Sequence, residues 1–97
     1  MPAYLVVENR IRDASILDLY IRLIDPIIKK YGGRFLVRAG KVSPLMGGWK
    51  PEQMIILEFP SAEKGRQFGS SPEYRELIHL QEQGAEMKAV LLEGAAE

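Results

Sequence analysis

The sequence predicts an α+β domain in which four strands and two helices follow one another in the order β-α-β-β-α-β. Three observations lead to this prediction. Four short runs are rich in apolar, β-branched and aromatic residues, which favour strands. Two other segments place apolar residues three and four positions apart, which is the spacing of one face of a helix. Glycine, proline and small capping residues separate these runs, as expected of turns and helix ends.

The first strand is predicted over Tyr4–Ile11, and Asp13 after it is a suitable helix N-cap. Pro26 lies inside the helical pattern, so we expect either a kink or a second start with Asp25 as cap. Gly32 is expected to end this helix in the left-handed conformation. The predicted apolar stripe of the helix consists of Ile16, Tyr20, Leu23, Ile27 and Tyr31.

Two further strands are predicted over Arg34–Val42 and Gln53–Phe59. The stretch between them is rich in turn residues, so the two strands form an antiparallel hairpin with a long loop. Ser61 is expected to cap a short helix over Ala62–Phe68.

The second helical segment is expected in two parts, with the break at Gly69. Ser71 followed by a proline marks the start of the second part, which is expected to end at Gly84. The last strand is predicted over Met87–Glu93. We expect a single domain over residues 1–97, folded over residues 1–93, with a tail at 94–97. One face of the second part carries Tyr74, Leu77, Ile78 and Gln81.

The predicted element order is the ferredoxin-like one, an antiparallel sheet with both helices on one face. The four strands, however, contain nearly continuous apolar runs rather than alternating apolar and polar residues, as in Met54-Ile-Ile-Leu57. Such runs are typical of sheets that are buried on both faces. One chain has helices for only one face, so we expect a second copy of the chain to cover the other face in a two-fold homodimer.

The composition excludes several classes of function. The 97 residues include 13 basic and 13 acidic side chains and no cysteine. Balanced charge argues against a nucleic-acid partner, and the absence of cysteine excludes disulfides and thiolate sites. Apolar runs are too short for a membrane span, and the first residues do not resemble a signal peptide. We therefore expect a cytoplasmic protein with no membrane or nucleic-acid partner and no cofactor.

Several stretches resemble the bacterial family called domain of unknown function 1330. They come in the order and spacing of that family over nearly the whole chain. The resemblance implies a dimeric α/β-barrel fold, in which two ferredoxin-like subunits pack sheet to sheet, and it implies no catalytic residues. Two positions depart from the family: Ala39 replaces a more usual glycine, and Gly69 replaces a bulky residue. The stretches are YGGRFLVRAG, Gly48-Trp-Lys-Pro51, Ile56-Leu-Glu-Phe-Pro-Ser61 and Ser71-Pro-Glu-Tyr74.

Arg38 and Glu58 each follow the apolar part of a strand, near the same end of the predicted hairpin. A charge at such a place is either paired or in contact with water. The two residues are therefore either members of a structural ion pair, between themselves or with other groups, or charges at the mouth of a ligand pocket. A structural role is favoured.

Four other residues are candidates for a site. Tyr20 and Tyr74 can face the gap between helices and sheet, and their hydroxyls need partners if buried. Trp49 lies in the long loop, where it packs on a second copy or covers a pocket, and the former is favoured. His79 is the only histidine; it would suit a general base or a haem ligand, but a surface position is favoured. Scattered glutamates such as Glu8 do not predict a metal site.

Two functions from different classes fit these patterns. The first is binding of a small apolar molecule between sheet and helices, with polar groups supplied by Arg38, Glu58, Tyr74, Tyr20, Trp49 and His79. The second is a non-catalytic dimeric module that acts through interaction. The sequence leaves open whether the protein is an enzyme. It indicates neither a substrate nor a reaction.

Overall fold

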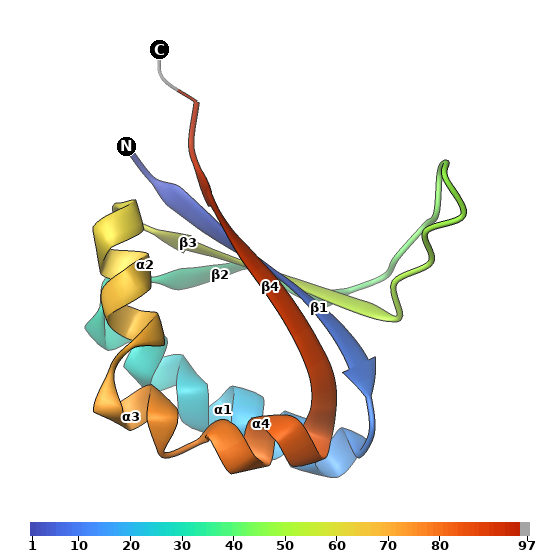
Figure 1. Cartoon of the computed structure of the whole chain (residues 1–97), viewed down its shortest axis with the longest axis horizontal. Helices are drawn as coiled ribbons and strands as arrows, with labels where there is room; N and C mark the ends of the chain where they lie inside the picture. The colour runs from blue at the N-terminus through green and yellow to red at the C-terminus, as the bar shows by residue number, and fades with distance from the viewer. Residues whose placement is uncertain (96–97) are drawn as a thin grey trace.

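The computed structural model describes residues 1–95 and confirms the α+β, ferredoxin-like order of elements. Four antiparallel strands form a sheet in the order β2-β3-β1-β4, and all helices lie on one face of it (Figure 1). Of the expected tail, residues 96 and 97 lie outside the described residues. The elements are β1 (Ala3–Ile11), α1 (Ala14–Lys30), β2 (Arg34–Gly40), β3 (Gln53–Phe59), α2 (Ala62–Gly69), α3 (Pro72–Arg75), α4 (Ile78–Gly84) and β4 (Ala85–Glu93).

Helix α1 starts where the sequence predicts. The backbone N–H groups of Ser15 and Ile16 donate to Asp13 Oδ1 at 3.1 and 3.2 Å, as expected of an N-cap. Of the two alternatives at Pro26, a second start with Asp25 as cap is wrong, since α1 continues through Pro26 to its end. Pro26 is exposed, so the carbonyl that loses its helical partner there can bond to water.

The buried face of α1 differs from the predicted stripe. Leu23 and Leu19 are 42% and 43% exposed, and of the predicted stripe only Tyr20 is fully buried. Apolar residues surround most of this helix, so several stripes at helical spacing exist, and only contact with the sheet selects one of them. Ile16, Ile27 and Tyr31 remain at its half-buried flank. The buried residues are Leu17, Tyr20, Ile21, Ile24 and Ile28.

The end of α1 confirms the expected glycine cap. Gly32 has φ +81°, and its N–H donates to the carbonyl of Lys29 at 3.0 Å. The N–H of Gly33 donates to the carbonyl of Ile28 at 2.9 Å. These two bonds form a Schellman motif, which satisfies carbonyls that the helix itself leaves free.

Strand β2 ends at Gly40, two residues before the predicted end at Val42. Its pairing with β3 is irregular between Phe35 and Val37 and again between Arg38 and Gly40. Ala39, at the second irregularity, has φ +58°, a conformation that favours glycine. This position is one of the two departures from the family pattern.

The second helical segment has three parts rather than the two expected. Gly69 ends α2, as predicted, and Ser71 caps α3 by accepting from the N–H of Tyr74 at 3.2 Å. A further break at Glu76–Leu77 separates α3 from α4. Strand β4 follows α4 directly and starts at Ala85, two residues before the predicted start.

The core lies between the sheet and the helices. Phe59 and Ile28 are 0% and 1% exposed at its centre. Within the described residues, no helix is long and apolar enough to cross a membrane.

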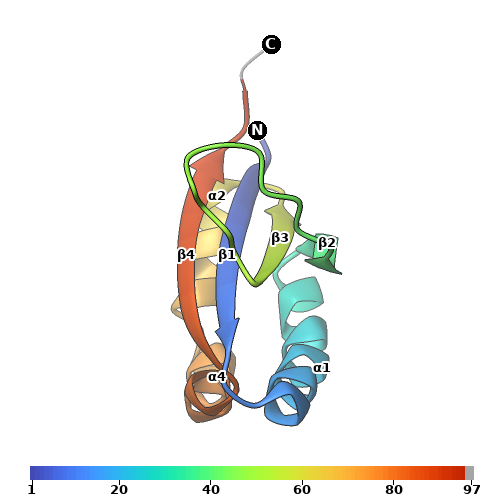
Figure 2. The same cartoon turned by 90° about the vertical axis from the view of Figure 1, so that its right-hand side faces the viewer.

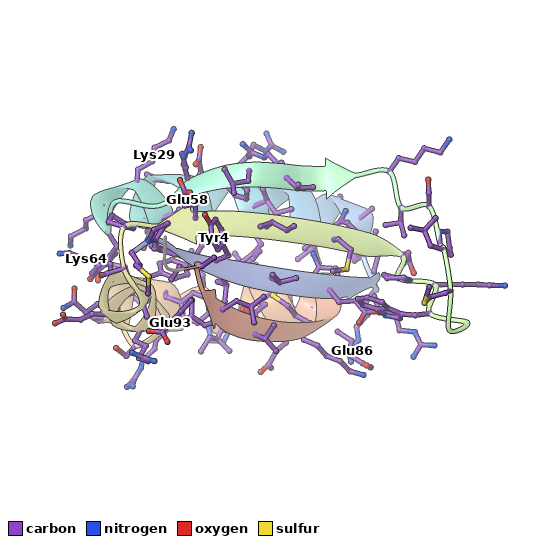
Figure 3. The ribbon with its side chains drawn as sticks, turned by 90° about the horizontal axis from the view of Figure 1, so that it is seen from above. Tyr4, Lys29, Glu58, Lys64, Glu86 and Glu93 are labelled. Carbon is purple, nitrogen blue, oxygen red and sulfur yellow. The ribbon has the colours of Figure 1, made fainter. Side chains whose placement is uncertain are left out.

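None of residues 1–95 covers the other face of the sheet, and we call it the open face (Figure 3). Residues of β1 alternate, so that Val7 is buried under the helices while its neighbour Val6 belongs to the open face. Leu36, Val90 and Leu92 are 44%, 57% and 52% exposed there. The apolar runs of the strands therefore supply two apolar faces, as the sequence indicates. The loop between β2 and β3 extends past one end of the sheet (Figure 1), and in Figure 2 this loop lies in front of the sheet, toward the viewer.

Replacing Gly32 by valine tests the cap of α1. The positive φ of Gly32 strains any side chain, and a Cβ there would lie 2.9 Å from Pro60 Cγ. We expect Gly32→Val to lower the free energy of unfolding by about 1–3 kcal/mol. Gly69→Val is the matched control, because a Cβ at Gly69 meets nothing within 4 Å and its φ is not positive. Equal urea midpoints for the two variants would contradict the cap.

Candidate functional site

A cavity of ≈ 70 Å³ lies between the helices and the sheet. Helix α1 forms one wall with its buried stripe, and the strands β1, β3, β2 and β4 form the floor. Its lining is almost entirely apolar, as is usual for small-molecule sites. The lining residues are Leu5, Val7, Tyr20, Ile21, Ile24, Ile28, Phe35, Ile55, Leu57, Phe68, Tyr74, Met87 and Ala89.

The polar groups of this cavity come from two tyrosines that meet at one glutamine. Tyr20 Oη donates to Gln81 Oε1 at 3.2 Å, and Tyr74 Oη donates to the same oxygen. Burial raises the pKa of both phenols above the ordinary value of 10.0, and for Tyr20 the neighbouring Tyr74 adds to the shift. Both hydroxyls are therefore protonated at neutral pH, so neither is a phenolate base.

Helix α3 holds Tyr74 against the cavity. The ring of Phe68 lies between those of Phe59 and Tyr74, with centroids 5.4 and 5.3 Å away. Glu73, on the same short helix, forms an ion pair with Lys30, and it accepts a hydrogen bond from Tyr31 Oη at 3.4 Å. The hydrogen bond from Lys30 lowers the pKa of the Glu73 carboxyl below its usual range. These contacts tie α3 to the end of α1.

The cavity reaches the surface beside β4. Ala89 lines it although this residue is exposed, whereas the α1 residues of the wall are buried. Ala89 therefore marks the mouth of the cavity. Met87, which is half-buried next to the mouth, has a flexible side chain that can adapt to a ligand.

Arg38 lies near the cavity but does not line it. Its guanidinium stacks 4.7 Å from the centroid of Phe35, which is a lining residue. Arg38 Nη1 lies 4.0 Å from Asp25 Oδ2, and the side chain is 46% exposed. Arg38 therefore covers the outside of one aromatic wall and pairs weakly with α1.

Of the two structural alternatives, a direct ion pair between Arg38 and Glu58 is wrong, and each of them lies within ion-pair distance of another group. Arg38 pairs in register with Ile55, whose side chain is buried under the helices, whereas Glu58 belongs to the open face. The partner of Glu58 is Arg34, directly opposite in the ladder, with 2.9 Å between Arg34 Nε and Glu58 Oε1. Because β2 and β3 are antiparallel, Glu58 near the end of β3 lies opposite the start of β2, and Arg38 lies farther along β2, opposite Ile55. Glu58 and its β1 neighbour Tyr4 are labelled in Figure 3.

Two other candidates are also separate from the cavity. Trp49 is 59% exposed in the loop and lines a shallow groove on the open face with Val6, Met54 and Val90. His79 is exposed on α4. The structure thus brings together Tyr20 and Tyr74, with Arg38 one side chain away, and it separates Glu58, Trp49 and His79 from them.

Two polar residues near the core had no place among the predicted site residues. In the sequence, Gln81 is noted only as one of four residues on the same face of the second helical segment. Its hydrogen bonds with both tyrosines depend on the breaks around α3. Asn9 is 0% exposed on β1; its Nδ2 donates to Gln53 Oε1 at 2.7 Å, and its Oδ1 has no hydrogen-bond partner among the described residues. Within residues 1–95, no group of three or more histidine, cysteine, aspartate or glutamate side chains is placed to hold a metal ion.

A family model described as Domain of unknown function (DUF1330) matches residues 2–95. No curated protein matches the chain. Among solved structures, a protein of unknown function from Rhodopseudomonas palustris is 22% identical with a TM-score of 0.77, and the match covers 99% of this chain and 84% of that one.

Two more distant structures share the fold. The cofactor-independent oxygenase SnoaB from Streptomyces nogalater is 9% identical with a TM-score of 0.67, and the match covers 99% of this chain and 95% of that one. A dimeric protein of unknown function and ferredoxin-like fold from Bacteroides fragilis is 12% identical with a TM-score of 0.54, and 96% of each chain is covered. At such identities the likeness shows the fold alone.

Double-mutant cycles in urea separate the two possible partners of Glu58. Arg34→Met with Glu58→Gln should give a coupling energy of about 0.2–1 kcal/mol, which is usual for an exposed pair. Arg38→Met with Glu58→Gln should give a coupling energy near zero, because the two side chains lie on opposite faces of the sheet. A larger coupling for Arg38 than for Arg34 would contradict the observed register.

Proposed function

The chain belongs to the family Domain of unknown function (DUF1330), and from this premise we propose that it binds a compact, neutral, largely apolar molecule between its sheet and its helices. The observation that carries this proposal is the cavity at Tyr20 and Tyr74, where two phenol hydroxyls meet at an otherwise apolar wall. An apolar pocket with a few convergent polar groups is the usual form of a small-molecule site.

Binding is favoured over catalysis by the chemistry of the lining. Among the lining residues, only Tyr20 and Tyr74 can ionise, and burial keeps both protonated at neutral pH. General base catalysis needs a group whose pKa lies near the working pH. The histidine of the chain, His79, is exposed on α4 and is not a lining residue.

We propose as well that the protein is a homodimer in which the open faces of two copies pack together. The open face is apolar in its centre, with Val90 and Leu92 more than half exposed. Soluble monomers rarely leave such a patch in water. Acidic and basic residues lie opposite each other at one end of the open face, where Glu8 pairs in register with Lys88 and Arg10 with Glu86. Such a mixed surface can complement a second copy of itself.

Ligand titration followed by NMR of the full chain tests the first proposal. Cyclopentane, cyclopentanone and cyclopentanol are suitable probes, because they present the same five-membered ring with no polar group, with a carbonyl and with a hydroxyl. At least one should bind saturably and shift the methyl signals of the lining residues. Ala89→Phe should close the mouth and weaken binding at least about tenfold. Gln67→Phe, at an exposed position of α2, is the control that should leave binding unchanged. Failure of all three probes to bind would overturn the proposal.

Light scattering at micromolar concentration tests the homodimer. The wild-type chain should have twice the monomer mass. Val90→Glu should weaken the dimer at least about tenfold, because the change buries charge at the interface. Leu19→Glu is the control, since Leu19 is similarly exposed but lies on α1, away from the open face. A monomer mass for the folded wild type would contradict the homodimer.

A further inference from the structure

We propose that the cavity selects molecules that donate a hydrogen bond, namely small neutral alcohols and phenols, and rejects molecules of the same shape that can only accept one. This inference rests on the proposed binding function and goes further, because it names the chemical class of the ligand. It follows from the directions of the hydrogen bonds among Tyr20, Tyr74 and Gln81.

The hydroxyl protons of Tyr20 and Tyr74 are both engaged in hydrogen bonds within the protein. A carbonyl oxygen has no proton, so Tyr20 and Tyr74 must each donate to Gln81 Oε1. This oxygen has two lone pairs and receives two donors, which leaves it little capacity to accept from a ligand. What each phenol still offers is the lone-pair side of its own oxygen. A ligand at this end of the cavity therefore meets acceptors.

Charged ligands are disfavoured by the same lining. Lysine, arginine and histidine are absent from the lining residues, so an anion would lose its water without gaining a partner. Aspartate and glutamate are absent from them too, so a cation would find only neutral oxygens. A neutral hydroxyl loses less on leaving water, and one good hydrogen bond can replace what it loses.

The volume limits the size of the ligand. Liquid water occupies about 30 Å³ per molecule, and an engineered apolar cavity of about 150 Å³ binds benzene. A cavity of ≈ 70 Å³ thus has room for a few non-hydrogen atoms. A ligand with one small ring fits if Met87 moves aside toward the open mouth, and a larger one does not.

The same NMR titration with the matched pair cyclopentanol and cyclopentanone tests the inference. Both molecules have the same number of non-hydrogen atoms, but only the alcohol can donate. In the wild type, the dissociation constant of cyclopentanone should be roughly tenfold higher, because its carbonyl would face lone pairs and lose its bonds to water.

Gln81→Met should strengthen the binding of cyclopentanone, a result that a destabilised fold would not produce. Methionine has a similar length and no strong acceptor, so the change frees both tyrosine protons to donate to a ligand. Cyclopentanone should then bind at least as tightly as cyclopentanol. Tyr31→Phe is the matched control, because the hydroxyl of Tyr31 bonds to Glu73 and not to Gln81. This variant should keep the preference of the wild type.

The possible outcomes distinguish this inference from the proposed function. If none of the probes binds, the proposed function itself is wrong. If cyclopentane and cyclopentanone bind as tightly as cyclopentanol, the cavity is a ligand site but its selection of donors is wrong. Tighter binding of cyclopentanone by the wild type would also overturn the inference, and would indicate that the amide of Gln81 is turned so that its NH₂ group faces the tyrosines.

Discussion

The sheet needs an apolar cover on both of its faces, and this requirement determines how the helices and the site are arranged. The four strands carry apolar side chains on both faces, but α1 and the short helices lie on one face only. On the covered face, the phase of α1 is set by contact with the sheet, which brings Tyr20 into the core. On the other face, valine and leucine side chains are exposed to water, which favours packing against a partner surface. The cavity and the proposed dimer are thus two results of the same one-sided arrangement.

The breaks in the second helical segment create the space for a site. A continuous helix of this length would press a regular apolar stripe against the sheet and fill the gap beneath it. Instead Ser71 and the break after Glu76 isolate α3, whose Tyr74 turns toward Tyr20. Ser71 is buried and uses its hydroxyl twice, as acceptor from Tyr74 and as donor to the carbonyl of Phe68. The site therefore depends on local backbone bonds more than on the length of any helix.

Features set by local chemistry were predictable from the sequence, and features set by packing were not. Caps are formed by residues next to the helix ends, as with Asp13, Gly32 and Ser71, so these helix ends could be predicted from residue type. The buried stripe of α1 was misplaced because its apolar residues allow several phases. The partner of Glu58 was misassigned because, in an antiparallel hairpin, the end of β3 lies opposite the start of β2, at Arg34, and not beside the end of β2, near Arg38. The role of Gln81 had no signal of its own, since it arises from the fold around α3.

The pairing of β1 with β4 has a consequence for how the chain folds. Strand β1 is central in the sheet, yet one of its two neighbours is the last strand of the described chain, and the pairing extends from Ala3 opposite Glu93 to Ile11 opposite Ala85. The N–H of Gly94 also donates to the carbonyl of Pro2 at 2.8 Å. A ladder between sequence-distant segments closes a long loop, which lowers the folding rate. During synthesis, β1 must wait for β4 to be made before its own hydrogen bonds are complete.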